Sequence, residues 1–370
     1  MKKLGFGCMR LPVLGAADKV DIPQFSQMVD KFLASGFTYF DTSYVYHGGK
    51  SEDALRQALV ERHPRGSFTI TTKLPVFLLK NREDTRRFFS EQLDRLGTDY
   101  VDYYWLHALN AASYENAVRL HAFEEIAQLK SEGKIRHIGF SFHDSADVLE
   151  RILTEHPDME YVQLQLNYFD WDSETVQSRA CYETAKRHRK PVIVMEPVKG
   201  GVLANVPQPI KTLFRQKQPN LSDASWAIRF AAGLDNVMMV LSGMSDLEQL
   251  ADNASYMEHF TPLDAEENRI IAEAVRIFDE RKAVDCTSCG KCIDVCPAHI
   301  PIADYFKMYN DHCRMNKNTN GMVYYAAFPQ GTGKASACTG CRKCEEVCPQ
   351  KLPVAKLMGD VKTAFEWSMV

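Results

Sequence analysis

The chain has 370 residues, of which 45% are hydrophobic, and its formal net charge at pH 7 is −4. This is enough apolar sequence for a large core and for more than one domain. The small negative charge argues against nucleic acid or an anionic membrane surface as a partner, and no apolar run reaches the length of a membrane span. The apolar N-terminal stretch is broken by Gly5, Gly7 and Arg10, which makes it a poor signal peptide, so we expect a cytoplasmic protein.

Residues 1 to about 282 alternate between short apolar or β-branched segments and longer amphipathic segments. The short segments, which we expect to be strands, are Leu4–Cys8, Thr38–Thr42, Phe68–Lys73, Val101–His107, His137–Ser141, Tyr161–Asn167, Val192–Glu196 and Val237–Ser242. The amphipathic segments, which we expect to be helices, are Ile22–Ser35, Ser51–Arg62, Arg82–Leu96, Ala117–Glu132, Ala146–Glu155, Ser173–Arg187, Ser222–Ala232 and Leu247–Met257. Eight such units favour an α/β fold of the closed (β/α)8 TIM-barrel type over an open, doubly wound sheet.

A further amphipathic helix is expected over Asp264–Lys282, and the composition changes after it. Cys, Pro and Gly become frequent and regular periodicity weakens, so we place a domain boundary near residue 283. This divides the chain into a barrel domain of residues 1–282 and a smaller domain of residues 283–370. The smaller domain holds a repeated cysteine motif, whose copies are separated by an expected helix over Ile302–Met315 and a loop over Asn316–Lys334.

Polar residues close three consecutive strands of the expected barrel. The second, third and fourth strands end at Asp41, Lys73 and His107, and Tyr46 follows in the loop after Asp41. In this fold, chemistry is done where strands end and the following loops begin. One such residue alone could be structural, but buried charges are costly unless they are paired or face a wet pocket, so we expect the four to lie together.

Such a group suits proton transfer to a carbonyl oxygen. A tyrosine has a pKa of about 10, and a nearby ammonium stabilises its phenolate form. A carboxylate beside Lys73 would keep that ammonium charged, and His107 could donate a hydrogen bond to the same substrate oxygen. The set therefore predicts a catalytic site that polarises and protonates a carbonyl.

Four segments carry a family resemblance. DTSYVYHGGKSE, ITTKLP, DYYWLHAL and IRHIGFSFHD, in this order, resemble the aldo-keto reductase family, over nearly all of residues 1–257. The resemblance implies a (β/α)8 barrel that reduces aldehydes or ketones, its small-molecule carbonyl substrates, with NAD(P)H. It also implies that Tyr46 is the general acid, that Lys73 and Asp41 tune it, and that His107 orients the substrate.

The same resemblance implies that Ser141 and Gln163 hold the carboxamide of the nicotinamide. Independently, Gln163, Gln165 and Asn167 alternate with apolar residues, which puts three polar side chains on one face of the sixth strand. We therefore expect Asn167 to be a further cofactor-binding residue, with plain polar packing inside the barrel as the alternative.

The sequence departs from the family at the cofactor positions. Phe142 follows the serine of the GFS motif where the family often has Asn, and Met195 stands where it has a tyrosine that stacks on the nicotinamide. In the loop after the eighth strand, Gly243 and Gln249 replace the lysine and arginine that bind NADP. Without those cations the 2′-phosphate of NADP loses its partners.

That loop nevertheless keeps candidate cofactor-binding residues, namely Ser242, Gly243 and Asn253. NADPH, NADH, a differently bound nicotinamide and a flavin all stay open as the cofactor of the barrel. A flavin is included because barrels bind flavin phosphates at their last two loops without a strict sequence pattern.

The segments CTSCGKCIDVCP and CTGCRKCEEVCP both have the spacing C-x2-C-x2-C-x3-C-P. This is the run of bacterial ferredoxins, in which three cysteines hold one cluster and the cysteine before proline reaches the other. It predicts two [4Fe–4S] clusters in a small α+β ferredoxin-like domain. The ligands would be Cys286, Cys289, Cys292 and Cys348 for one cluster, and Cys338, Cys341, Cys344 and Cys296 for the other. Structural zinc, the alternative, usually draws its cysteines from two separated pairs.

Some proteins that resemble aldo-keto reductases carry such a ferredoxin tail, and this chain resembles them. Clusters pass single electrons, whereas nicotinamides exchange hydrides. The clusters could relay electrons to or from the barrel or a ferredoxin- or flavodoxin-type redox partner, or could only brace the fold. In a third hypothesis the barrel binds a flavin or another cofactor and the protein is an electron-transfer module. The complete Asp41, Tyr46, Lys73 and His107 set favours a carbonyl/alcohol oxidoreductase.

Overall fold

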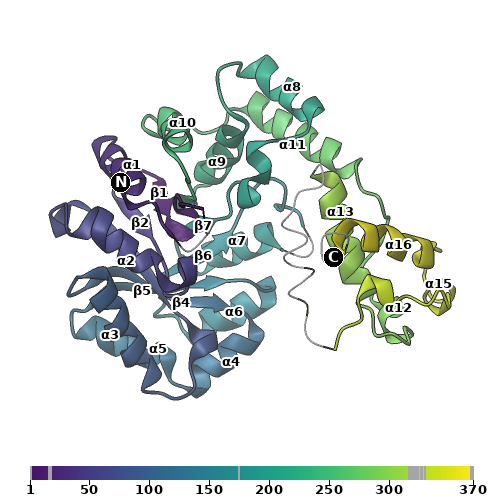
Figure 1. Ribbon diagram of the computed structural model, residues 1–370, viewed down its shortest axis with the longest axis horizontal. Helices are drawn as coiled ribbons and strands as arrows, with labels where there is room; N and C mark the ends of the chain where they lie inside the picture. Colours follow the sequence, from purple (N-terminus) through teal and green to yellow (C-terminus); the bar gives the residue numbers. More distant parts are fainter. Residues whose placement is uncertain are drawn as a thin grey trace. The chain divides into compact units, whose positions relative to one another are not determined.

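The computed structural model describes residues 2–15, 19–173, 176–315, 325, 328 and 331–366. Its strands form a closed parallel barrel in the order β1 to β8, because β1 pairs with both β2 and β8 (Figure 1). The strands are β1 Leu4–Gly7, β2 Tyr39–Asp41, β3 Thr69–Leu74, β4 Val101–Leu109, β5 Ile135–Phe142, β6 Tyr161–Gln165, β7 Val192–Met195 and β8 Val237–Ser242. The predicted TIM barrel is confirmed, with each strand within a few residues of its predicted bounds.

The helices of the barrel unit surround these strands. They are α1 Ile22–Ala34, α2 Ser51–Leu55, α3 Asp84–Leu96, α4 Ala111–Arg119, α5 Ala122–Ser131, α6 Ala146–Glu155, α7 Ser178–Arg187, α9 Asp223–Gly233 and α10 Leu247–Met257. The helix predicted over Ala117–Glu132 is wrong as one element, because His121 has a left-handed backbone (φ 56°) and separates α4 from α5. The helix predicted over Ser51–Arg62 continues from α2 as a π-turn over Arg56–Val60. Residues 174 and 175 of the predicted helix Ser173–Arg187 lie outside the described residues.

Large side chains fill the inside of the barrel. Tyr39, Tyr103, Trp105 and Met239 form one buried cluster there. Trp105 packs directly on Gly139 of the neighbouring strand, where an added Cβ would lie 2.7 Å from the indole ring and 2.3 Å from a backbone oxygen. The interior is therefore solid, and space for a ligand is left only at the ends of the strands.

The chain divides into two compact units, Met1–Ala204 with Leu221–Ala265, and Asn205–Asn220 with Glu266–Val370. The second unit includes α8 (Gln208–Lys217), which was not predicted, and α11 (Ala265–Asp279). An ion pair joins Lys217 to Glu266 in this unit. The domain boundary near residue 283 stays a prediction.

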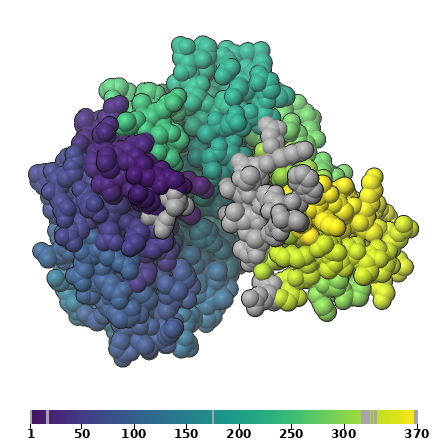
Figure 2. Space-filling view, viewed as in Figure 1, coloured from purple at the N-terminus to yellow at the C-terminus, as the bar shows by residue number. Residues whose placement is uncertain are grey.

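Four helices follow α11 in the second unit: α12 Lys291–Asp294, α13 Ile302–Arg314, α15 Lys343–Glu346 and α16 Val354–Phe365. The two cysteine motifs are far apart in sequence but lie side by side, with α12 against α15 (Figures 1 and 2). Most of the loop predicted over Asn316–Lys334 lies outside the described residues. Within the described ranges, no helix is both long and apolar enough to cross a membrane.

Candidate functional site

Asp41 and Lys73 form a buried ion pair where β2 and β3 lie side by side. Lys73 Nζ donates to Asp41 Oδ1 at 2.5 Å, to the Thr42 carbonyl at 2.7 Å and to the Tyr46 hydroxyl at 3.4 Å. The other carboxylate oxygen of Asp41 accepts from Gln163 Nε2 at 3.3 Å. Lys73 is only 1% exposed. A pair this deeply buried is stable only when its remaining hydrogen-bonding groups are used, as they are here.

The loop after β2 holds Tyr46 over this pair. The Tyr46 backbone N–H donates to the Ser43 carbonyl at 3.3 Å. The next residues, His47 and Gly48, have left-handed backbones with φ of 51° and 60°. His47 Nε2 accepts from the Leu11 N–H at 3.0 Å, which ties the turn to the segment after β1. This short, braced turn brings Tyr46 back toward Lys73.

A bulge at the end of β4 sets His107. Ala108 is left-handed (φ 56°), and the register of β4 against β5 shifts between Leu106 and Leu109. The His107 ring lies 5.9 Å from the Tyr46 ring, centroid to centroid, in an edge-on arrangement. Its Nδ1 atom is buried and makes no hydrogen bond with any described residue. The ring therefore lies beside the Tyr46 phenol, but His107 is not among the residues that line the cavity next to Tyr46.

Burial shifts the pKa values of both Tyr46 and His107. It raises the pKa of Tyr46 and outweighs the lowering effect of the Lys73 ammonium. The lysine thus acts in the expected direction, but desolvation of the phenol has the larger effect on its pKa. Burial lowers the pKa of His107 to about 3, and the charges of Lys73 and His143 act in the same direction. At neutral pH, Tyr46 is therefore a protonated phenol and His107 a neutral imidazole.

A cavity of about 730 Å³ opens beside Tyr46 and Asp41. This volume is within the range of small-molecule sites. Five predicted cofactor-binding residues line it: Gln163, Met195, Ser242, Gly243 and Asn253. The cavity therefore joins the polar group at the ends of β2 and β3 to the loops after β7 and β8.

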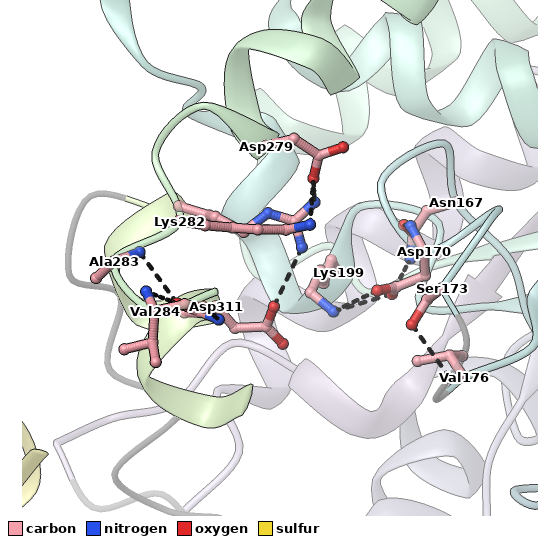
Figure 3. A network of polar contacts seen from close by, with 12 residues as sticks. Asn167, Asp170, Ser173, Val176, Lys199, Asp279, Lys282, Ala283, Val284 and Asp311 are labelled. Carbon is pink, nitrogen blue, oxygen red and sulfur yellow. Dashed lines mark hydrogen bonds and ion pairs between the residues drawn. The ribbon is translucent and has the colours of Figure 1, made fainter. Parts of the chain in front are cut away.

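Two other predicted cofactor-binding residues are not on the wall of this cavity. Ser141 Oγ accepts the Ala108 N–H at 2.8 Å and so braces the β4 bulge. Asn167 donates to Asp170 Oδ2 at 2.9 Å and to the Glu196 carbonyl at 3.1 Å. Asp170 in turn accepts from Lys199 Nζ at 2.8 and 2.9 Å (Figure 3). Asn167 thus belongs to the plain polar packing that the sequence left open as an alternative.

The cavity wall also contains charged residues that sequence reasoning missed, namely Arg10, Glu196, Asp246 and Glu248. Arg10 comes three residues after β1 ends, and Asp246 and Glu248 come soon after β8. The signal that could reveal them is the same as for Asp41, Lys73 and His107, since each follows the end of a barrel strand.

The cysteine motifs line two small cavities in the second unit. One is lined by Cys286, Cys289, Cys292 and Cys348, and the other by Cys296, Cys338, Cys341 and Cys344. Each cavity thus takes three cysteines from one motif and the cysteine before proline from the other, which fits two four-iron clusters with exchanged fourth ligands. No three Cys, His, Asp or Glu side chains in the described ranges converge as ligands of a single metal ion. In a four-iron cluster, each thiolate binds a separate iron.

The comparisons with known proteins agree with both halves of the chain. It matches the model of the aldo/keto reductase family over residues 3–276 and that of a 4Fe-4S dicluster domain over residues 285–353. It is similar to the uncharacterized oxidoreductase YqkF of Bacillus subtilis, with 23% identity over 68% of this chain and 86% of that protein. It is also similar to an NADH-specific methylglyoxal reductase of Escherichia coli, with 24% identity over 65% of this chain and 85% of that protein.

Solved structures agree on the fold. An aldo-keto reductase from Bacillus halodurans in its holo form superposes with a TM-score of 0.59 and 24% identity, covering 74% of this chain and 91% of that one. One from Klebsiella pneumoniae, in complex with NADP and acetate, has a TM-score of 0.58 and 19% identity, with coverages of 73% and 90%. The chain is therefore an oxidoreductase that belongs to the aldo/keto reductase family and carries a C-terminal 4Fe-4S dicluster domain.

Proposed function

We propose that the barrel interconverts a carbonyl compound and its alcohol with a nicotinamide cofactor, and that the two clusters relay electrons to or from this site or a redox partner. The observation that carries the first part is the position of Lys73 Nζ, which contacts both Asp41 Oδ1 and the Tyr46 hydroxyl beside the cavity. The names of the relatives and structural neighbours, which include NADH and NADP, support a nicotinamide.

A nicotinamide held in the cavity lined by Gln163, Met195 and Asn253 would supply a hydride for the carbonyl carbon. Tyr46 gives its hydroxyl proton to the carbonyl oxygen, so that the substrate gains one hydride and one proton and becomes an alcohol. The Lys73 ammonium stabilises the phenolate that Tyr46 becomes, and Asp41 keeps Lys73 charged and in place. His107, as a neutral imidazole, donates a hydrogen bond to the same oxygen and orients the carbonyl. A proton from solvent then restores Tyr46.

The cluster cavities support the relay. Val354 of α16 lines both cavities, so two clusters held there are close neighbours. Each [4Fe–4S] cluster passes one electron, so two reduced clusters hold the two electrons of a hydride, and the flavin of a flavodoxin-type partner would combine them with a proton from solvent. A ferredoxin- or flavodoxin-type protein would be a suitable external partner for the relay.

A second candidate is an electron-transfer protein whose barrel binds a flavin, which exchanges both single electrons and hydrides. Met195 favours it, because this cavity-lining residue replaces the aromatic ring that stacks on the nicotinamide in the family. Chemical identification of the small molecules released by denaturing the anaerobically purified protein separates the two candidates. A released flavin would favour the second candidate, and its absence together with NADH- or NADPH-dependent turnover would favour the first.

Tyr46→Phe tests the catalytic assignment directly. We expect it to lower kcat for reduction of a panel of aldehydes and ketones by at least about 100-fold, because it removes the general acid. Tyr44→Phe is the matched control, since the Tyr44 hydroxyl donates to Glu91 at 2.8 Å and Tyr44 does not line the cavity. Both variants should keep the visible absorbance of the clusters. Full turnover by Tyr46→Phe would remove the assignment.

The relay has its own test. The clusters are reduced with dithionite, the excess reductant is removed, and an oxidised nicotinamide, a flavodoxin and the carbonyl substrate are added anaerobically. Under the relay proposal the cluster absorbance recovers as alcohol forms, with two electrons used for each alcohol. Clusters that stay reduced while added NADH still drives normal turnover would favour the bracing role.

A further inference from the structure

The part of the cavity formed by the loop after β8 is acidic. Asp246, Glu248 and Asp252 line it. Gly243 and Gln249, which by resemblance replace the family's two phosphate-binding cations, line it too. Among the described residues on the cavity wall, Arg10 is the one cation. A dianionic phosphate placed beside this loop would meet carboxylates of its own sign.

The donors that a phosphate could use at the start of α10 are already engaged. Asp246 caps the helix, with Oδ1 accepting the Gln249 N–H at 2.8 Å and Oδ2 accepting Gln249 Nε2 at 2.8 Å. Gln249 Oε1 accepts the Ser245 N–H at 3.0 Å, so the Gln249 amide is tied into the loop at both ends. A helix N-terminus normally attracts anions, but here a carboxylate of the chain itself fills that role.

A ribose without a phosphate suits the same loop. Its 2′-hydroxyl is a donor, and a carboxylate that accepts from this hydroxyl is the usual way in which proteins select NAD over NADP. Glu248 is exposed in the first turn of α10 and makes no salt bridge with any described residue, so its carboxylate is available for such a bond.

Arg10 also lines the cavity, and its stem packs against Gly243. An added Cβ on Gly243 would lie 3.5 to 3.7 Å from Cβ, Cγ and Cδ of Arg10, so the stem of Arg10 covers the position from which the family's lysine would extend. Ser245 Oγ donates to the Arg10 carbonyl at 2.8 Å and holds this arrangement. No carboxylate of the described residues lies within 4.0 Å of the Arg10 guanidinium, which is therefore available to an anionic ligand.

We propose that the cavity is selective for NADH, with Asp246 and Glu248 rejecting the 2′-phosphate of NADPH and Arg10 pairing with the pyrophosphate that both dinucleotides share. This proposal rests on the proposed function, since it names the nicotinamide that the same site takes. In this proposal the carboxylates of the loop repel the 2′-phosphate, and Arg10, which packs against the same loop, binds the phosphates common to both dinucleotides.

Equilibrium titration of the anaerobic holoprotein with NADH and NADPH tests it. We expect NADH to bind at least about 100-fold more tightly, corresponding to about 2.7 kcal/mol. The double variant Asp246→Asn/Glu248→Gln removes both charges but keeps a capping residue, because Asn caps helices as well as Asp. It should tighten NADPH binding at least tenfold and change NADH binding less than threefold. Glu258→Gln, near the other end of α10, is the control and should change neither.

Arg10→Gln completes the test, and it should weaken both dinucleotides by a similar factor of about ten. Loss of NADPH binding alone in this variant would mean that Arg10 holds the 2′-phosphate, and would overturn the proposal. Equal or tighter binding of NADPH by the wild-type protein would overturn it as well, while leaving the proposed function intact. If the wild-type protein binds neither NADH nor NADPH, both this proposal and the proposed function are contradicted.

Discussion

Replacing Lys73 with Met tests the buried pair on which the candidate site depends. In this variant the Asp41 carboxylate stays buried, with Gln163 Nε2, at 3.3 Å, as its remaining side-chain donor. Removing one partner of a buried ion pair costs about 3–5 kcal/mol, because the other charge is left uncompensated. At roughly 2–4 °C per kcal/mol for a domain of this size, the melting temperature should fall by about 6–20 °C.

The pH dependence of this loss has a definite sign. Burial raises the pKa of Asp41, and Lys73 opposes that rise, so Lys73→Met raises it further. A carboxyl group with a raised pKa in the folded state is destabilising when ionised, and the penalty shrinks as the pH falls toward that pKa. The difference in melting temperature between wild type and Lys73→Met should therefore be largest at neutral pH and smaller near pH 5.

The double variant Asp41→Asn/Lys73→Met separates stability from catalysis. It removes both charges, and replacing a buried pair by neutral groups of similar size is often close to neutral for stability. We expect its melting temperature to recover toward that of the wild type, while kcat stays about 100-fold or more below it. Calorimetry and a carbonyl-reduction assay on the same preparations check this. If the double variant is no more stable than Lys73→Met, the loss of stability does not come from the uncompensated charge of Asp41.

Three further outcomes are expected. Anaerobic protein should contain about eight iron and eight sulfide per chain, from two four-iron clusters, and a zinc-only analysis would contradict the ligand assignment. The pKa of His107 is lowered to about 3, so below pH 6.5 the unfolded chain binds a proton that the folded chain does not. The free energy of unfolding should therefore fall by up to about 1.4 kcal/mol per pH unit. In denaturant titrations, His107→Gln should show a smaller fall. Gly139→Ala should lower the free energy of unfolding by about 1–3 kcal/mol, because the added methyl group overpacks against Trp105. Gly66→Ala, whose added Cβ has nothing within 4 Å, should leave the denaturation midpoint nearly unchanged.

The barrel could be predicted because its signals are local. Each strand is a short apolar run, and adjacent parallel strands bring their ends together, so Asp41 and Lys73 meet as expected. The spacing of the cysteines also predicts which of them line the same cavity, because in the two-cluster ferredoxin run the cysteine before proline belongs with the other cluster. Both predictions needed only the order of strands and helices along the chain and the spacing of the apolar residues and cysteines.

The sequence does not reveal the hydrogen-bond partners of Ser141 and Asn167, whose binding to a cofactor stays a prediction. Ser141 braces Ala108 because that residue adopts a left-handed bulge, and an alanine in the sequence gives no sign of one. Asn167 donates to Asp170, three residues away, because leaving a buried carboxylate without hydrogen-bond donors is costly. Register and spacing place a side chain at a strand end, but only the neighbouring loops decide which partner it takes.

Proton supply and electron supply are separable in this chain. Clusters carry electrons and no hydride, so any reduction of a carbonyl that starts from them still needs a proton at the oxygen. Burial raises the pKa of Tyr46 and lowers that of His107, so under the proposed function the phenol would be the proton donor near neutral pH, whatever the source of electrons. Tyr46→Phe should therefore block alcohol formation from NADH and from pre-reduced clusters to the same extent. A variant that loses only the NADH-driven reaction would mean that the clusters reduce their substrate at another site.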